Sequence, residues 1–220
     1  MLDSSTYAEV AEITGRTLLV SGAALAFAVL LGVPAGVAVA VRRSFPGRGL
    51  VMALVNTGMG LPPVVVGLIV ALALFRGGPL GGLEWMYTIR AMVLAQAIIA
   101  FPLVMGFTAA GVQQLDPNLT LQLRSLGVRG PRLGWILLRE ARLSALAAVM
   151  AGFGGAISEV GAVMMVGGNI RGETRVLTTA VVQHTRMGDF STAVALGIVL
   201  LVLAFAVNVA FTRVQQGGRK

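Results

Sequence analysis

The chain has 220 residues, of which 56% are hydrophobic and only 12% are charged, and its mean hydropathy is +0.87. A soluble domain would carry about 25% charged residues, so this composition excludes an ordinary soluble domain and indicates a membrane protein. The chain has no cysteine, which excludes disulfides and a cysteine-based metal site. The net charge of +8 does not predict a nucleic-acid partner, because the basic residues are concentrated between apolar runs.

Five charge-poor runs follow one another along the chain, at 17–41, 49–75, 91–115, 143–170 and 190–212. Each is at least as long as the ~20 residues that an α-helix needs to cross ~30 Å of hydrocarbon. We therefore expect an all-α membrane protein in one domain, 1–220, with five transmembrane helices. Their expected spans are 17–41, 50–75, 91–115, 143–166 and 190–212.

The distribution of basic residues between the runs predicts the orientation. Segments 42–48 and 116–142 hold three and five arginines, and the tail after 212 holds three more basic residues. The alternate segments are poorer in arginine or carry acids. By the positive-inside rule the N-terminus lies outside and the C-terminus in the cytoplasm. The acidic segment before the first run is unlike a cleavable signal peptide, so we expect that run to be retained.

Helix-breaking and small residues lie inside the runs. Pro62, Pro63 and Pro102 predict kinks beside other protein or a watery cavity, where freed backbone groups find partners. Gly32 and Gly36 have the GxxxG spacing that allows close helix contact. Ordinary membrane packing explains each feature alone, but together they favour a bundle that moves.

The basic segment 116–142 is expected to contain two short helices. Asp116 followed by Pro117 is typical of a helix start. The following residues place Leu119, Leu123 and Leu126 on one helical face.

A glycine elbow is predicted between these two helices. Gly127 can end the first helix in a left-handed conformation, and Gly130 with Pro131 can begin the next at Arg132. Such a basic hairpin either lies on anionic lipid or docks a cytoplasmic partner.

The absence of a P-loop motif restricts the function. No G-x-x-x-x-G-K-[ST] occurs, so ATP-driven work would need a separate subunit. Five helices with almost no internal charge make a poor complete pore, whereas two copies in a symmetric dimer could enclose one. A secondary transporter or channel is the alternative, although more intramembrane ionisable residues and an internal repeat would then be expected. A membrane scaffold would leave the elbow unexplained.

The elbow resembles the cytoplasmic "EAA" loop of permease subunits of type I ABC importers, in which this loop forms the helix that couples to the ATPase. The matching residues are Arg124, Ser125, Leu126, Gly127, Val128, Arg129, Gly130 and Pro131. Leu121, Gln122 and Leu123 stand in place of the family's Glu-Ala-Ala. Further along, 158–162 and 167–180 look like the oxyanion branch of tungstate, molybdate and sulfate permeases, and most like the tungstate permeases.

The resemblance implies a non-enzymatic transport subunit of the prokaryotic cytoplasmic (inner) membrane. Its partners would be a second copy of itself, cytoplasmic ABC ATPases that bind the ATP, an external oxyanion-binding protein and membrane lipid. No cofactor or metal is expected in this chain. The imported oxyanion would be tungstate, or else molybdate or sulfate.

Polar residues at the outer end of the fourth run are candidates for the oxyanion pathway or its gate. They are Glu159, Asn169, Arg171, Thr174, Arg175, Thr178 and Thr179. Arginine suits an oxyanion because its planar fork can donate two parallel hydrogen bonds. As an alternative, Arg171 and Arg175 are ordinary outer charges that touch headgroups or a binding protein.

Glu159 would repel an anion, so we expect it to be structural or gating and to be paired or hydrogen-bonded, with Arg175 or Arg171 as partner. The alternative is a solvated interfacial carboxylate. His184 is expected in an outer loop, without a special role.

Overall fold

The structure is a computed structural model that describes residues 4–42 and 44–217. This part of the chain is helical, without β-strands. Its elements are α1 (Ser4–Val41), α2 (Arg48–Met59), α3 (Pro63–Leu74), the 3-10 helix η1 (Gly81–Leu83), α4 (Ile89–Gln113), α5 (Pro117–Ser125), α6 (Gly130–Glu140), α7 (Arg142–Ile157), α8 (Gly161–Gly167), α9 (Leu177–Arg186) and α10 (Phe190–Gly217).

Three of these helices, α1, α4 and α10, are long and apolar enough to cross a membrane without interruption. Two further spans are made by bent pairs, α2 with α3 at 102° and α7 with α8 at 57°. With each pair counted as one span, the described residues provide five spans. The predicted all-helical membrane fold is confirmed. The second span is broken where only a kink was expected, and the break in the fourth span was not predicted.

The two breaks have different local causes. Between α2 and α3 the chain passes through Pro62, with φ −59° and ψ 122°, into Pro63 at the start of α3. Neither proline donates a backbone hydrogen bond, and the ring of Pro63 disfavours a helical Pro62. Between α7 and α8 there is no proline, and the three residues Ser158–Val160 leave the helix while a side chain caps the next one.

Helices α1 and α4 form the centre of the bundle and pack along each other. Gly36 makes the contact close, because a Cβ atom there would lie 2.6 Å from the carbonyl oxygen of Met105. The predicted role of the Gly32–Gly36 pair in close helix contact is therefore confirmed. Pro102 lies inside the continuous helix α4 and does not break it.

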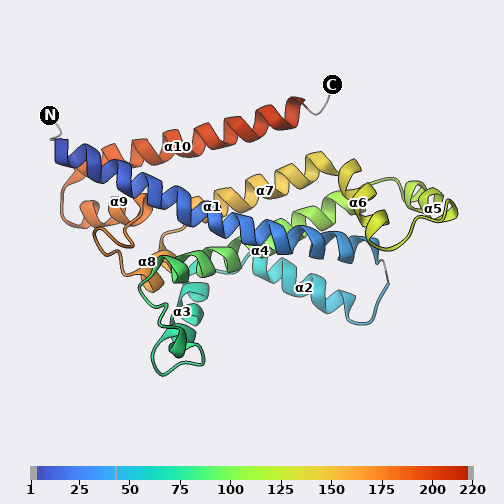
Figure 1. Cartoon of the computed structure of the whole chain (residues 1–220), viewed down its shortest axis with the longest axis horizontal. Coiled ribbons are helices and arrows are strands. Elements are labelled where there is room, and N and C mark those ends of the chain that lie inside the picture. Colours follow the sequence, from blue (N-terminus) through green and yellow to red (C-terminus); the bar gives the residue numbers. More distant parts are fainter. Residues whose placement is uncertain (1–3, 43, 218–220) are drawn as a thin grey trace.

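The bundle has two ends (Figure 1). The α5–α6 end carries the elbow, and the α9 end carries the start of α1 together with α9 and the loop that precedes it. Helix α3 and η1 extend sideways from the long axis, and α10 runs along one side of the bundle. The most apolar window of α10 is only 6% buried, so most of its surface is left for lipid or another chain.

Candidate coupling and translocation sites

The first candidate site is the elbow between α5 and α6. Asp116 caps α5 as expected, since its Oδ1 accepts the N–H of Asn118 at 2.8 Å, and Pro117 occupies the first helical position. Arg124 is exposed and its Nη2 donates to the carbonyl of Val41 at 3.4 Å, which ties α5 to the end of α1.

The elbow itself is a Schellman motif. Gly127 has φ +80°, and its N–H donates to the carbonyl of Arg124 at 3.0 Å. The N–H of Val128 donates to the carbonyl of Leu123 at 2.9 Å, which completes the motif. Gly130 also has a positive φ, +60°, at the start of α6. The predicted left-handed end of the helix is therefore confirmed.

One prediction about the elbow is wrong. Leu119 and Leu123 pack against an apolar cluster that includes Leu133, but Leu126 is 79% exposed. The helix ends at Ser125, so the helical spacing that would place Leu126 on the same face no longer applies, and Val128 takes the inward position. The exposed Leu126 is left beside Arg124 at the surface.

The second candidate site is an open pocket of 540 Å³ where the two broken spans meet. Its lining includes Gly60, Pro62 and Pro63 from the first break and Ser158 and Glu159 from the second. Pro102 of α4 forms part of its wall. The expectation that the prolines lie beside a cavity therefore agrees with the structure. A break in each helix frees backbone groups that an unbroken helix would bond internally.

Glu159 lies at the second break and is 7% exposed. Its Oε1 accepts the N–H of Ala162 at 2.8 Å, so the carboxylate caps α8. The expectation of a hydrogen-bonded Glu159 is correct, but the predicted partners Arg171 and Arg175 are wrong. These arginines bind another acid, and the Glu159 carboxylate accepts a backbone N–H three residues further along the chain.

The polar residues around α9 form most of their hydrogen bonds within the chain. Thr178, which is buried, donates to the carbonyl of Glu159 at 3.0 Å. Thr174 donates to the carbonyl of Gly167, and Thr179 accepts the N–H of Val176 at 3.1 Å. Asn169 donates to Gln183 at 2.7 Å. These four candidates therefore hold the loop between α8 and α9 in shape.

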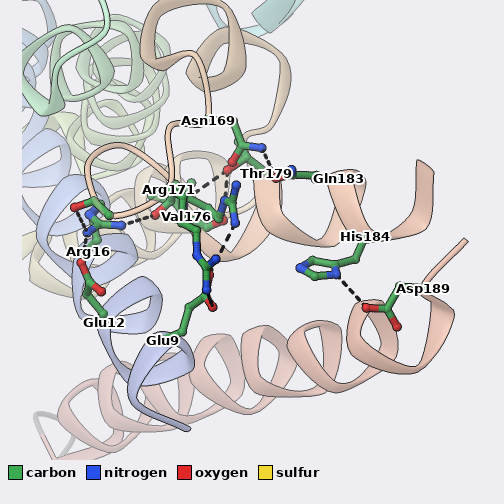
Figure 2. Close-up of polar contacts among 12 residues, drawn as sticks. Glu9, Glu12, Arg16, Asn169, Arg171, Val176, Thr179, Gln183, His184 and Asp189 are labelled. Atoms are coloured by element: carbon green, nitrogen blue, oxygen red, sulfur yellow. Dashed lines mark hydrogen bonds and ion pairs between the residues drawn. The ribbon is translucent and has the colours of Figure 1, made fainter. Parts of the chain in front are cut away.

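Arg171 lies against Glu9 at the start of α1 (Figure 2), and Arg175 pairs with the same acid. Arg171 donates through Nε and Nη2 to the two carboxylate oxygens of Glu9, at 3.0 and 2.6 Å. Arg175 Nη1 lies 3.5 Å from Oε1 of the same carboxylate. Two loop arginines thus converge on one anion that comes from a segment more than 160 residues away. We call Glu9, Arg171 and Arg175 the clasp.

Two residues of α1 that were not predicted from the sequence fix the same loop. Arg16 is 9% exposed and donates to the carbonyls of Arg175 and Gly172, at 2.9 and 2.8 Å, while it pairs with Glu12. Thr17 accepts the N–H of Leu177 at 2.9 Å and so anchors the first turn of α9. An arginine and a threonine at the edge of an apolar run were the only sequence signals for this role.

His184 lies in the last turn of α9 and not in a loop, which corrects the prediction. Its Nδ1 is 3.0 Å from Oδ2 of Asp189. Asp189 also accepts hydrogen bonds from Ser191 and from the N–H of Thr192 at the start of α10. Hydrogen bonds from Thr192, and then from His184, lower the pKa of Asp189 from 3.8 to about 2.

Five spans, two of them broken around a shared pocket, define a multi-span helical protein of the membrane. The chain belongs to the family described as "Binding-protein-dependent transport system inner membrane component", whose model matches residues 32–220. Members of this family are membrane components of transport systems, so the chain is a transport subunit and not an enzyme.

Several known proteins resemble the chain over most of its length. It is 42% identical to the "Probable anion ABC transporter permease protein" of Haloferax volcanii, over 90% of this chain and 87% of that one. It is 38% identical to the "Tungstate uptake system permease protein TupB" of Peptoclostridium acidaminophilum, over 91% and 87%. The "Molybdenum transport system permease protein ModB" of Escherichia coli K12 is more distant, at 29% identity over 86% and 88%.

The fold is also found among solved structures. A chain of the inward-facing MetNI methionine ABC transporter superposes with a TM-score of 0.79 over 98% of this chain and 99% of that one, at 17% identity. An amino acid ABC transporter gives a TM-score of 0.68 at 18% identity, over 98% and 97%. These likenesses establish the permease fold.

Proposed function

We propose that this chain is the permease subunit of an ATP-driven ABC importer for a tetrahedral oxyanion, with tungstate as the first candidate and molybdate or sulfate next. The observation that carries the proposal is the 38% identity to a tungstate uptake permease over 91% of the chain. Molybdenum and sulfate permeases are also similar, at 29% and 28% identity. The shared chemistry of these substrates is a divalent tetrahedral anion.

In this proposal the α5–α6 end faces the cytoplasm and the α9 end faces outwards. The arginine-rich segment 116–142 supports the orientation, because basic residues concentrate in cytoplasmic loops. The chain acts as one membrane domain and pairs with a second copy. Two cytoplasmic ATPases dock on the elbows, and an external binding protein delivers the anion to the α9 end.

The elbow residues from Arg124 to Pro131 would form the coupling surface. Leu126 supports this role, since a leucine that is 79% exposed next to Arg124 offers an apolar contact flanked by a charge. The Schellman motif fixes the position of both side chains relative to α6. An ATPase that docks on α5 would therefore bind a surface of fixed geometry.

The pocket at the two breaks would form one half of the anion pathway, completed by the second copy. Its position supports this role, since both broken spans and Pro102 line it. Glu159 would serve as a structural cap in this pathway and not as an anion ligand, because its carboxylate accepts the N–H of Ala162. A larger pocket of 790 Å³ between α1 and α4 is lined by apolar side chains and Arg90, and suits lipid better than a hydrated anion.

The gate would be the segment from Glu159 to Thr179. Thr178, Thr174 and Thr179 would position it, and Asn169, Arg171 and Arg175 would border its outer face. Because the hydrogen bonds of Arg16 and Thr17 tie this segment to α1, the gate would move together with that helix.

The experiment is reconstitution in proteoliposomes with the cognate ATPase and binding protein. We expect uptake of tungstate that requires ATP, the ATPase and the binding protein, with molybdate and sulfate as weaker competitors. Isothermal titration of the binding protein with the three anions gives their order independently. Uptake of tungstate by the chain alone, driven by an ion gradient, would place it among the secondary transporters and contradict the proposal.

A further inference from the structure

The clasp holds its carboxylate in the way that arginines hold a free oxyanion. Arg171 gives Glu9 a two-pronged contact with one nitrogen on each oxygen, at 3.0 and 2.6 Å. This parallel fork is the geometry that arginine uses for carboxylate, phosphate and similar anions. Arg175 Nη1 lies 3.5 Å from Oε1 of the same carboxylate.

We propose that Arg171 and Arg175 form an outer oxyanion site that the carboxylate of Glu9 occupies in this structure. Glu9 is then an internal anion that competes with the incoming substrate for the two guanidinium groups. The inference rests on the proposed function, since it takes a tetrahedral oxyanion as the substrate. It adds a binding site and names the residue that competes for it.

The arginines are only partly used by Glu9. Arg175 has a side chain that is 11% exposed, and its Nε is buried without a hydrogen-bond partner among the described residues. The distance of 3.5 Å from its Nη1 to Glu9 is at the limit of a hydrogen bond. A carboxylate has two oxygens and one negative charge, whereas a tetrahedral dianion has four oxygens and two charges. The dianion therefore satisfies the paired arginines better than the carboxylate does.

The exposure of the clasp makes exchange feasible. The side chain of Arg171 is 74% exposed and that of Glu9 is 28% exposed, so water and ions reach the pair. Exposed ion pairs contribute little to stability and are screened by salt. Release of Glu9 therefore does not have to disturb the buried hydrogen bonds that hold the loop.

The neighbouring pair of Arg16 and Glu12 is built differently and is not part of the site. Arg16 is buried and donates to two backbone carbonyls, so its guanidinium is committed to the loop. Within 9–16 and 168–176 there are three arginines and three glutamates, whose charges cancel. Loss of the Glu9 charge alone leaves a net charge of +1 beside the arginines.

Glu12 provides a matched control for Glu9. Both are acids on the same helix and both pair with an arginine, but Glu12 pairs with Arg16. Neutralising either acid changes the net charge equally. Only the change at Glu9 frees the arginines of the site.

The test measures binding of radiolabelled tungstate to the purified permease in detergent, without ATPase or binding protein, by equilibrium dialysis. We expect Glu9→Gln to bind tungstate about threefold to fivefold more tightly than the natural chain, the range that an exposed competing pair would give. Glu12→Gln should differ from the natural chain by less than about twofold. Arg171→Gln added to Glu9→Gln should remove the gain.

A second measurement uses the natural sequence and does not depend on any variant. Tungstate should slow the modification of Arg171 by phenylglyoxal, read by peptide mass spectrometry, and should leave the exposed Arg76 unaffected. Equal binding by the Glu9→Gln and Glu12→Gln proteins, or no protection of Arg171, would overturn the inference.

The two proposals fail in different ways. Reconstituted tungstate uptake could be ATP-dependent while the Glu9→Gln protein gains no affinity for tungstate. In that case the proposal that Glu9 competes with the substrate is wrong, and the proposed importer function is retained. If neither uptake nor binding of any of the three oxyanions is found, the importer proposal fails, and the inference fails with it.

Discussion

The hydroxyl of Thr178 donates a hydrogen bond of 3.0 Å to the backbone carbonyl of Glu159. Through it α9 holds the chain at the point where the fourth span is broken, and the carbonyl freed by the break is satisfied. The side chain of the same glutamate caps α8. Both sides of the break are thus stabilised by the side chains of Glu159 and Thr178.

Replacement of Thr178 should therefore destabilise the break. Thr178→Val keeps the shape but leaves a buried carbonyl unsatisfied, and we expect a loss of about 1–3 kcal/mol in the free energy of unfolding. Thr185→Val is the control on the same helix, because its exposed hydroxyl bonds only to the carbonyl of Val181 one turn earlier. Thermal unfolding in detergent measures both. An equal loss in the two variants would show that the contact with Glu159 is unimportant.

The contact of Gly36 with α4 predicts a strong steric effect. In Gly36→Ala the new methyl group would lie 2.6 Å from the carbonyl oxygen of Met105, so α1 and α4 must separate, at a cost of about 1–3 kcal/mol. Gly22→Ala, on the same helix with no atom within 4 Å of its Cβ, should leave stability unchanged or raise it. The apparent melting temperatures of the two variants in detergent test this prediction. Similar values for both would contradict it.

The positive φ of Gly127 predicts a variant that is folded but uncoupled. A β-branched residue is strongly disfavoured at φ +80°, so Gly127→Val should distort the elbow while the spans keep their packing. Gly127→Asn is the control, because asparagine tolerates the left-handed region. We expect ATP-driven tungstate uptake in proteoliposomes to be lost in the valine variant and largely kept in the asparagine variant. Normal uptake by the Gly127→Val protein would show that the elbow is not needed for coupling to the ATPase.

The lowered pKa of Asp189 predicts a defined pH dependence. Since its pKa is about 2 in the folded protein and 3.8 otherwise, its ionised form contributes stability above about pH 4. That contribution is lost as the pH falls from 4 towards 2. The difference in melting temperature between the natural chain and Asp189→Asn should be constant above pH 5 and shrink below pH 4. A difference that does not change over this range would show that the carboxylate is not stabilised by its partners.

The proposed orientation can be tested by labelling, because the natural chain has no cysteine. Ser44 and Gly82 are both exposed and lie in connections on opposite sides of the membrane in this proposal. An impermeant thiol reagent should label Gly82→Cys in intact cells and should reach Ser44→Cys only after the cells are opened. Labelling of Ser44→Cys from outside would contradict the proposed topology.

The apolar runs were sufficient to predict the helical membrane fold, since length without charge is a strong signal. They were not sufficient to predict the breaks. Pro62 and Pro63 indicated a kink, and the 102° turn depends on how α3 packs against α8. That packing includes Gly67, where a Cβ would lie 2.5 Å from Cα of Ala162. The break at Glu159 contains no proline, and the sequence showed only an acid inside an apolar run.

The partners of Glu159, Arg171 and Arg175 show the limit of reasoning from nearby sequence. Residues 12 and 16 positions apart were predicted to pair, but the arginines bind Glu9, 162 and 166 positions away. A single sequence contains no signal for such a contact, because it depends on the fold that brings α1 beside the loop. The Schellman elbow, by contrast, is local, and its glycine was predicted correctly.

The apolar cluster under the elbow has a mechanical consequence. Leu123 and Val128 pack in one cluster with Val37 and Ala40, near the end of α1. From Ala40 back to Arg16 the helix is continuous, which is roughly 36 Å at 1.5 Å per residue. Helix α1 thus contacts the elbow near one end, and near its other end Arg16 holds the loop before α9. In the proposed function, displacement of α5 would reach the α9 end through α1, without passing through the two broken spans.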